Sequence, residues 1–343
     1  MAKTVLLKFI IANFCGAFLF PLPLFANANT TDNIIPKRKH NDISSIAMKP
    51  CVNGEVGCVM SDTETYFYDR NHTRFQLVKS VPGEKMLNWF FLPGGPGVDS
   101  DYLLELINNM KMPGNYWLID LLGNGTNDQY KNMSPEIFKK WGDFLVEAIG
   151  KFENPVLVGH SFGGYLPLFC PQLEGILKGL VILNSTPTLQ SDIFSQTASK
   201  HQLPSLSEAQ ALFVEKKTLG TLQALYILEA FYFFAPGDRA LGIKRIIKKL
   251  QFSIPAEYWW YTQGVQFYKE ITWVPQKTPT LIIGGSYDYI TPLSLFEQDA
   301  RFKRKNIEVL LIKEAGHFPW LEQSDLLNKS LEHFSEKLRG RTL

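Results

Sequence analysis

One serine in this sequence occupies a pattern suited to nucleophilic chemistry. Residues 159–164 read GHSFGG and follow directly on the apolar run Pro155 to Val158. A G-x-S-x-G pattern at a strand-to-helix turn lifts the serine hydroxyl clear of a sheet, where it can attack a carbonyl carbon. Small residues at 159 and 163 allow neighbouring backbone to approach closely. Ser161 is therefore the candidate nucleophile.

The chain offers one suitable base for this serine. A serine hydroxyl is a weak nucleophile at neutral pH, so a base must take its proton and an acid must orient that base. Of the six histidines, His317 follows a predicted strand most directly, in a loop at the strand's carboxyl end. Functional groups of open α/β sheets converge on such loops. His160, beside the serine, is expected to be structural, with its side chain pointing away from the serine.

Asp288 is the candidate acid, because it closes the segment that follows the apolar residues 281–284. The preceding strand ends in Asn-Ser-Thr and supplies no acid. Two other acids, Glu297 and Asp299, fall inside the helix predicted next. An alternative interpretation is that Asp288 only caps that helix.

The negative charge on an attacked carbonyl oxygen needs hydrogen-bond donors. The backbone N–H of Phe162, at the start of the helix after the serine, is one candidate. The other is the N–H of Gly94 or Gly95, in the glycine turn that follows residues 86–92. Pro96 has no N–H and can only shape this loop.

These residues need a scaffold that brings strand ends together, and the apolar pattern predicts one. Apolar strands alternate with amphipathic helices, which indicates a mostly parallel sheet covered by helices on both faces. A hairpin is expected over residues 65–79, and helices are expected from N-caps at Ser134 and Ser324. Core strands are predicted at 86–92, 116–121, 155–159, 180–183, 280–284 and 307–312.

Residues 187–275 break this alternation. They contain no strand of the same kind and read as several helices rich in aromatic residues. An all-helical insert after the sixth strand, counted with the two strands of the hairpin, predicts a cap over the sheet edge. The expected organisation is a signal peptide at 1–28, an N-terminal arm at 29–54, a core at 55–186 and 276–343, and the cap at 187–275.

The N-terminus indicates export. Lys3 and Lys8 precede an apolar run that ends in Ala26-Asn27-Ala28, a small-residue cleavage pattern. The rival interpretation is a membrane anchor, but Asn13 and two prolines interrupt a run barely long enough to span a bilayer. We expect a periplasmic or secreted protein with no stable membrane span after removal of the signal.

The charge balance bears on the kind of partner, and the cysteines bear on disulfide formation and the core. Beyond the first 28 residues, 33 basic residues balance 33 acidic ones, so a nucleic-acid partner is not expected. In an oxidising compartment Cys51 and Cys58 can form a disulfide across the turn between them, or remain unpaired. Cys170 lies in an apolar stretch and is expected in the core.

Over residues 86–338 the sequence resembles the α/β-hydrolase fold family. Residues 159–163 match its nucleophile elbow, and the chain order Ser161, Asp288, His317 is the order that this family uses. Residues 120–125 resemble its D-x-x-G-x-G turn. Residues 92–97 are similar to the H-G-G-P-G stretch of proline iminopeptidase-like members, with Pro93 where those peptidases have histidine.

The resemblance implies a serine hydrolase that cleaves an ester or amide of a small or peptide-like substrate, as an esterase or an aminopeptidase, with no metal or organic cofactor. The N-terminal pattern adds export to this expectation. The aromatic insert predicts an apolar ceiling over the serine. A peptide amine would require a cap carboxylate, with Glu208, Glu215 or Glu229 as candidates. The alternative from another class is a non-catalytic member of the fold that binds a ligand under its cap.

Overall fold

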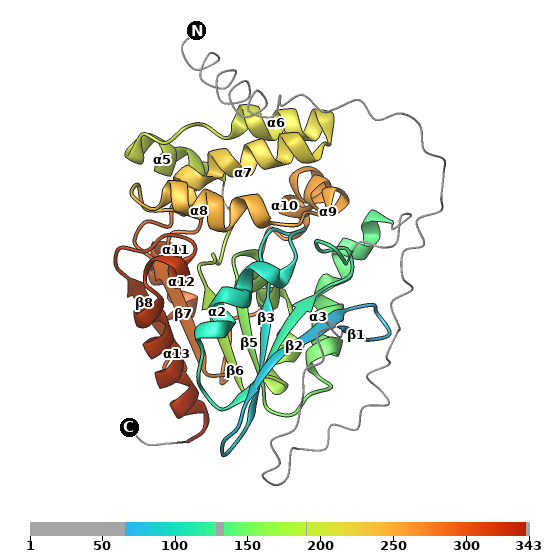
Figure 1. Ribbon diagram of the computed structural model, residues 1–343, viewed down its shortest axis with the longest axis vertical. Helices are drawn as coiled ribbons and strands as arrows, with labels where there is room; N and C mark the ends of the chain where they lie inside the picture. The colour runs from blue at the N-terminus through green and yellow to red at the C-terminus, as the bar shows by residue number, and fades with distance from the viewer. Residues whose placement is uncertain (1–65, 128–133, 190, 341–343) are drawn as a thin grey trace, which may run out of the picture. The chain divides into compact units, whose positions relative to one another are not determined.

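An eight-stranded sheet forms the centre of the fold, in the order β1-β2-β4-β3-β5-β6-β7-β8 (Figure 1). A computed structural model describes residues 66–127, 134–189 and 191–340. The first strands pair antiparallel, β1 with β2 and β2 with β4, and all later pairs are parallel. The strands are β1 Tyr66–Tyr68, β2 Arg74–Val81, β3 Leu87–Leu92, β4 Gly114–Asp120, β5 Pro155–His160, β6 Gly179–Leu183, β7 Thr280–Gly285 and β8 Ile307–Ile312. The predicted mostly parallel sheet is thus confirmed.

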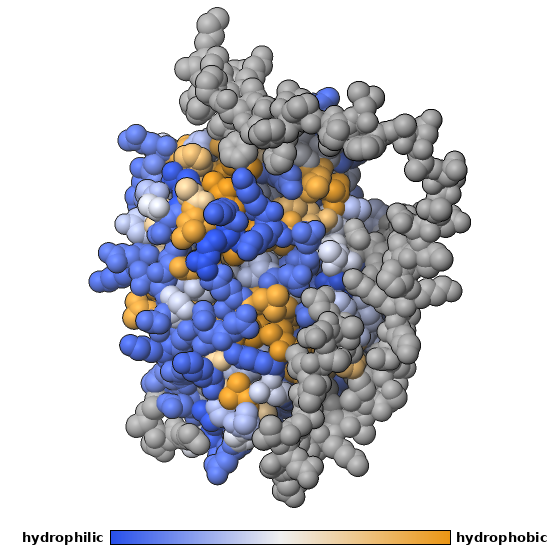
Figure 2. All heavy atoms as spheres, in the orientation of Figure 1, coloured by the Kyte–Doolittle hydropathy of each residue, from blue (hydrophilic) through white to orange (hydrophobic). Residues whose placement is uncertain are grey.

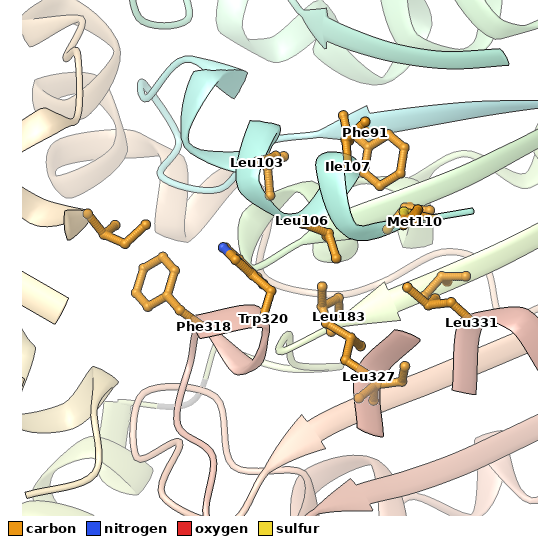
Figure 3. Packing of buried hydrophobic residues seen from close by; sticks show 14 of the residues in the cluster. Phe91, Leu103, Leu106, Ile107, Met110, Leu183, Phe318, Trp320, Leu327 and Leu331 are labelled. Carbon is orange, nitrogen blue, oxygen red and sulfur yellow. The ribbon is translucent and has the colours of Figure 1, made fainter. Parts of the chain in front are cut away.

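Both faces of the sheet are buried. In β3, Trp89 and Phe91 point into one apolar cluster while Phe90 points into the other, as the alternation of a strand requires. Helices α2 (Leu104–Asn109) and α13 (Ser324–Leu338) supply leucines to the first cluster, around Phe91 and Leu183 (Figure 3). Helices α3 (Trp141–Ile149) and α4 (Phe162–Tyr165) cover the second face.

Helix α13 shows how its sequence decides this placement. Leu327, Leu331 and Phe334 lie three or four residues apart and are buried. Burial of each such side chain contributes about 1.5–3 kcal/mol, enough to hold an otherwise polar helix on the sheet. Its outer side is mostly hydrophilic (Figure 2). The helix begins at the predicted Ser324, although Gln323 is the residue at the N-cap position.

Prolines shape the shorter helical segments. Ser134 caps its segment as predicted, by accepting a hydrogen bond from the Glu136 N–H, but Pro135 opens a 3-10 helix before α3 begins. After α4, Pro167 likewise lies in a 3-10 turn. The remaining core segments are η3 Ser100–Leu103, η4 Pro135–Lys140, η5 Leu166–Phe169, η6 Pro171–Gly175, α11 Ser294–Gln298, η9 Ala300–Phe302 and α12 Pro319–Glu322.

The chain between β6 and β7 is helical in its described residues, and Figure 1 shows these helices together at one end of the sheet. The loops after β3 and β8 contact them: Gly97 O accepts the Ser253 N–H, and Phe233 O accepts the His317 N–H. The limits 187 and 275 stay predictions. The helices are α5 Ser191–His201, α6 Ser207–Lys216, α7 Leu219–Phe233, α8 Arg239–Arg245, η7 Ile247–Lys249, α9 Ile254–Trp259, η8 Trp260–Gly264 and α10 Val265–Phe267.

Several sequence predictions lie outside the described residues: the signal peptide at 1–28, the arm at 29–54, and the Cys51–Cys58 pair. Cys170 is buried as expected, and burial raises the pKa of its thiol to about 12. Among the described helices, none has both the length and the apolar character needed to cross a bilayer.

Glu174 fixes the segment that returns from the inserted helices to β7. Its carboxylate accepts the backbone N–H groups of Gln276, Lys277 and Thr278 at 2.7–2.8 Å. It also accepts the Trp273 indole N–H at 3.0 Å. Burial alone would raise the pKa of Glu174, but the three backbone donors lower it to about 2. The charged carboxylate therefore stabilises the segment that leads from the inserted helices into β7.

We predict that Glu174→Gln lowers the free energy of unfolding by about 2–4 kcal/mol at pH 7, because an amide cannot satisfy these donors. The folded pKa lies below the ordinary 4.5, so the contribution is present above about pH 4.5 and is lost as the pH falls towards 2. Urea denaturation at pH 7 and pH 3 measures both effects. The exposed Glu153→Gln is the control. A deficit of the same size at both pH values, or in both variants, contradicts this role.

Candidate active site

Ser161 lies at a sharp turn between β5 and α4. Its backbone adopts φ 54° and ψ −122°, a conformation that costs a non-glycine residue about 1–3 kcal/mol. The turn is held by the Ser161 N–H, which donates to Leu183 O of β6 at 3.0 Å, and by the Ser161 carbonyl, which accepts the Gly164 N–H at 2.9 Å. The side chain is half-buried. The strand-turn-helix context predicted for this serine is therefore present.

Close backbone contacts explain the glycines around the serine. A Cβ at Gly159 would lie 2.0 Å from Gly163 O, and a Cβ at Gly163 would lie 2.3 Å from Leu92 O. The loop after β3 also passes directly beside the serine, since a Cβ at Gly94 would lie 2.8 Å from the Ser161 Cβ. Only glycine fits these contacts without moving backbone atoms.

Asp288 and His317 form a buried pair. The His317 Nδ1 lies 2.9 Å from the Asp288 Oδ2, and each residue is 2% exposed. Burial alone would raise the pKa of Asp288, but the charge and hydrogen bond of His317 lower it to about 2. An ionised acceptor at Nδ1 fixes the imidazole so that Nε2 is the nitrogen left for chemistry.

The other interpretation of Asp288 is also correct in part. Its Oδ1 accepts the backbone N–H groups of Ile290 and Thr291 and so caps the following turn, while Oδ2 serves His317. The rival acids are not at this position. Asp299 pairs with Arg301, and Glu297 is exposed.

Asn184 is a member of the site that sequence analysis missed. It follows the end of β6, between the strands that carry Ser161 and Asp288, and its amide donates to the Asp288 Oδ2 at 2.8 Å and to Gly316 O at 2.9 Å. It joins the acid to the loop that carries His317. The only sign of this role in the sequence was that Asn184 stands at the end of a predicted core strand that supplies no acid.

The three predicted residues lie at the carboxyl ends of β5, β7 and β8. The ring of His160, adjacent to Ser161, has its centroid 4.6 Å from that of His317. Within the described chain the Ser161 hydroxyl makes no hydrogen bond, so no hydrogen bond joins it to His317. Catalytic hydrogen bonds of this kind commonly tighten only with substrate bound.

Of the predicted backbone donors, Gly94 is already engaged. Its N–H donates to the Tyr102 hydroxyl at 2.7 Å. The N–H groups of Gly95 and Phe162 make no hydrogen bond within the residues described. Of the predicted donors, those of Gly95 and Phe162 therefore remain free of hydrogen bonds in the described chain.

The inserted helices reach the site through the end of α7. The Phe233 carbonyl accepts the His317 N–H at 2.6 Å, and the Phe233 ring stacks on the imidazole with centroids 5.0 Å apart. Residue 229 precedes Phe233 by about one helical turn, so Glu229 lies on the same side of α7.

Two carboxyl groups are buried in the inserted helices. Glu229 accepts the Tyr261 hydroxyl at 3.3 Å, and Glu257 accepts the Tyr226 hydroxyl at 2.6 Å. Burial raises the pKa of Glu229 to about 8 and that of Glu257 well above its usual range. Glu257 also lies against the loop after β3, because a Cβ at Gly97 would lie 2.9 Å from its Cγ.

Only one of the three cap carboxylates suggested by the sequence is therefore buried. Glu208 is exposed, and Glu215 is exposed and pairs with Lys216. Glu257 was missed because it precedes the aromatic run at 258–261, which reads as packing. In the described parts of the chain, no group of three His, Cys, Asp or Glu side chains is arranged to hold a metal ion.

Comparisons with known proteins agree with this architecture. The chain is 25% identical over 279 residues to the proline iminopeptidase of Saccharolobus solfataricus, a match that covers 73% of this chain and 85% of the relative. The solved structure of a proline iminopeptidase-related protein from Thermus thermophilus superposes with a TM-score of 0.59 at 17% identity. That superposition covers 82% of this chain and 100% of the Thermus chain.

A thermophilic esterase from Thermogutta terrifontis superposes with a TM-score of 0.56 at 16% identity, over 78% of this chain and 94% of the esterase. At such low identity the structural matches show the fold alone. The sequence profile described as the alpha/beta hydrolase family matches residues 89–329, a range that includes Ser161, Asp288 and His317. The chain therefore belongs to the alpha/beta hydrolase family.

Proposed function

We propose that this protein is a serine hydrolase that cleaves an ester or amide through an acyl-enzyme on Ser161. The observation that carries the proposal is the buried Asp288–His317 pair, 2.9 Å apart, at the sheet edge where Ser161 occupies its strained turn. A side chain held in this backbone conformation, beside a glycine loop and at the same sheet edge as an oriented imidazole, fits the needs of an attacking hydroxyl.

In this mechanism the Ser161 hydroxyl attacks the carbonyl carbon while the His317 Nε2 takes its proton. The imidazolium then gives that proton to the leaving group, and Asp288 stabilises the cation. The N–H groups of Gly95 and Phe162 would hold the oxyanion, where each donor is worth about 3–4 kcal/mol. Water, activated by His317, releases the acid and restores the serine. These steps use only groups of the chain and water.

We predict that Ser161→Ala folds normally but loses about four to six orders of magnitude in turnover, because no other hydroxyl can form the acyl-enzyme. Hydrolysis of a short p-nitrophenyl ester, together with thermal unfolding, measures this. Ser330→Ala on the surface of α13 is the control. A fluorophosphonate probe should label the wild type and not Ser161→Ala. A folded wild type that the probe leaves unlabelled would favour the ligand-binding alternative.

A specific observation favours a second, narrower candidate, an aminopeptidase resembling the proline iminopeptidases. Glu229 lies one turn from Phe233, which touches His317, and Glu257 lies against the loop that carries Gly95. Two buried carboxyl groups therefore flank the site from the inserted helices. A buried carboxylate is costly unless a cation pairs with it, and a substrate ammonium group would supply that cation. The match to a proline iminopeptidase supports the same candidate.

We predict that Glu229→Gln and Glu257→Gln each raise KM for an N-terminal proline amide about tenfold or more, because each removes a carboxyl that can ionise and pair with the bound amine. The KM for a short p-nitrophenyl ester, which has no amine, should change little. Glu208→Gln, at an exposed position, is the control.

The same substrates give a pH test. Glu229 has a folded pKa of about 8, so its carboxyl is neutral below that pH and charged above it. For the amide, kcat/KM should rise as the pH passes through about 8, and Glu229→Gln should remove this rise. Equal effects of the glutamine variants on ester and amide would contradict an amine-binding role and leave an esterase.

We also propose that the protein is exported and loses residues 1–28, on the pattern of Lys3, the apolar run and Ala26-Asn27-Ala28. Expression with the native N-terminus, cell fractionation and N-terminal sequencing measure this. The mature chain should begin at residue 29 outside the cytoplasm. A chain that keeps Met1 and remains in the cytoplasmic fraction would contradict export.

A further inference from the structure

The Tyr102 hydroxyl joins the glycine loop after β3 to His160. It accepts the Gly94 N–H at 2.7 Å and lies 2.7 Å from the His160 Nδ1. On the other side of the ring, the His160 Nε2 lies 2.8 Å from the carbonyl oxygen of His317. A continuous chain of three hydrogen bonds therefore runs from the loop after β3, through the residue before Ser161, to the loop after β8.

The proton positions in this chain follow from its two ends. Gly94 N–H can only donate, and the His317 carbonyl can only accept. The Tyr102 hydroxyl therefore gives its single proton to the His160 Nδ1, and the His160 Nε2 carries the proton donated to His317 O. Every donor and acceptor is satisfied when His160 is neutral.

The surroundings of His160 favour this neutral form. The residue is 2% exposed, and its ring packs on the rings of Phe318 and Trp320 with centroids 5.2 and 5.0 Å away. Figure 3 shows Phe318 and Trp320 beside the apolar residues of η3 and α2. Burial, and then the nearby His317, lower the pKa of His160 well below its usual range.

We propose that Tyr102 and His160 are positioning residues, which hold the loops of Gly94 and His317 at fixed places on either side of Ser161. The inference rests on the proposed hydrolase function. Ser161 follows His160 directly. One rigid chain of hydrogen bonds therefore fixes the positions of the Gly94 loop, the nucleophile and the His317 loop relative to one another. By engaging the Gly94 N–H, Tyr102 also leaves the next N–H, that of Gly95, to face a substrate.

Such a role has kinetic consequences that a packing role lacks. Displacement of a catalytic group by about 1 Å can cost about 100-fold in rate, even when binding is unchanged. A residue that only fills space would lower stability and the fraction of folded protein. It would not change the rate of each correctly folded site.

The first test is Tyr102→Phe, with Tyr116→Phe as the matched control. Tyr116 is also buried, and it lies on β4, away from the proposed site. Its hydroxyl donates to Met112 O at 2.5 Å. Both changes remove one buried hydroxyl. We expect Tyr102→Phe to lower kcat for p-nitrophenyl ester hydrolysis about 10- to 100-fold at nearly unchanged KM. The control should lose stability but keep kcat.

The rates are expressed per active site titrated by a fluorophosphonate probe, so that unfolded protein is excluded from the calculated kcat.

The second test compares His160→Gln with His160→Leu. A glutamine amide can still donate to the His317 carbonyl, whereas leucine cannot, so His160→Gln should keep at least about tenfold more kcat than His160→Leu.

Equal kcat per site in Tyr102→Phe and Tyr116→Phe would overturn the proposal, as would equal losses in His160→Gln and His160→Leu. If Tyr102→Phe does not fold, the comparison of His160→Gln with His160→Leu tests the positioning role by itself. These outcomes differ from failure of the hydrolase function itself, which would appear as a wild type that does not hydrolyse the ester or as unchanged turnover in Ser161→Ala.

Discussion

The site depends on keeping the Asp288 carboxylate ionised inside the protein. A buried carboxylate is unfavourable unless donors surround it, and here they come from separate parts of the chain. Backbone N–H groups of the same loop donate to Oδ1, while Oδ2 is served by the Thr291 hydroxyl, by Asn184 from the end of β6 and by His317 from beyond β8. The convergence of parallel strand ends makes this possible, because the sheet delivers each donor to the same edge.

The inserted helices are part of this arrangement as well as a cover. The Phe233 carbonyl fixes the backbone of His317, and Glu322 accepts both the Gly316 N–H and the Ala235 N–H. Hydrogen bonds through the Phe233 carbonyl and through the Glu322 carboxyl thus join the loop of His317 to the inserted helices. Burial raises the pKa of Glu322 to about 7, so this tie contains a carboxyl that changes charge near neutral pH. Movement of the insert and the position of the imidazole are physically linked.

The proposed amine specificity rests on the contrast between two kinds of buried carboxyl. Asp288 has donors enough to remain charged, whereas among the described residues Glu229 and Glu257 each accept a hydrogen bond only from a tyrosine hydroxyl, and burial raises the pKa of each. Carboxyls that lack a cation in the free protein are suited to receive one from a ligand. This contrast is the physical basis of the proposed aminopeptidase candidate.

The sequence by itself determined the parallel sheet and the positions of Ser161, Asp288 and His317 at strand ends, because apolar strands and glycine turns are local patterns. Only the tertiary structure shows that the Gly94 N–H is engaged, since this depends on a tyrosine hydroxyl folded back onto the loop. Asn184 and Glu257 likewise gained roles from contacts across the chain. Local periodicity specifies where a strand ends, but only packing specifies which polar groups meet there and which remain free.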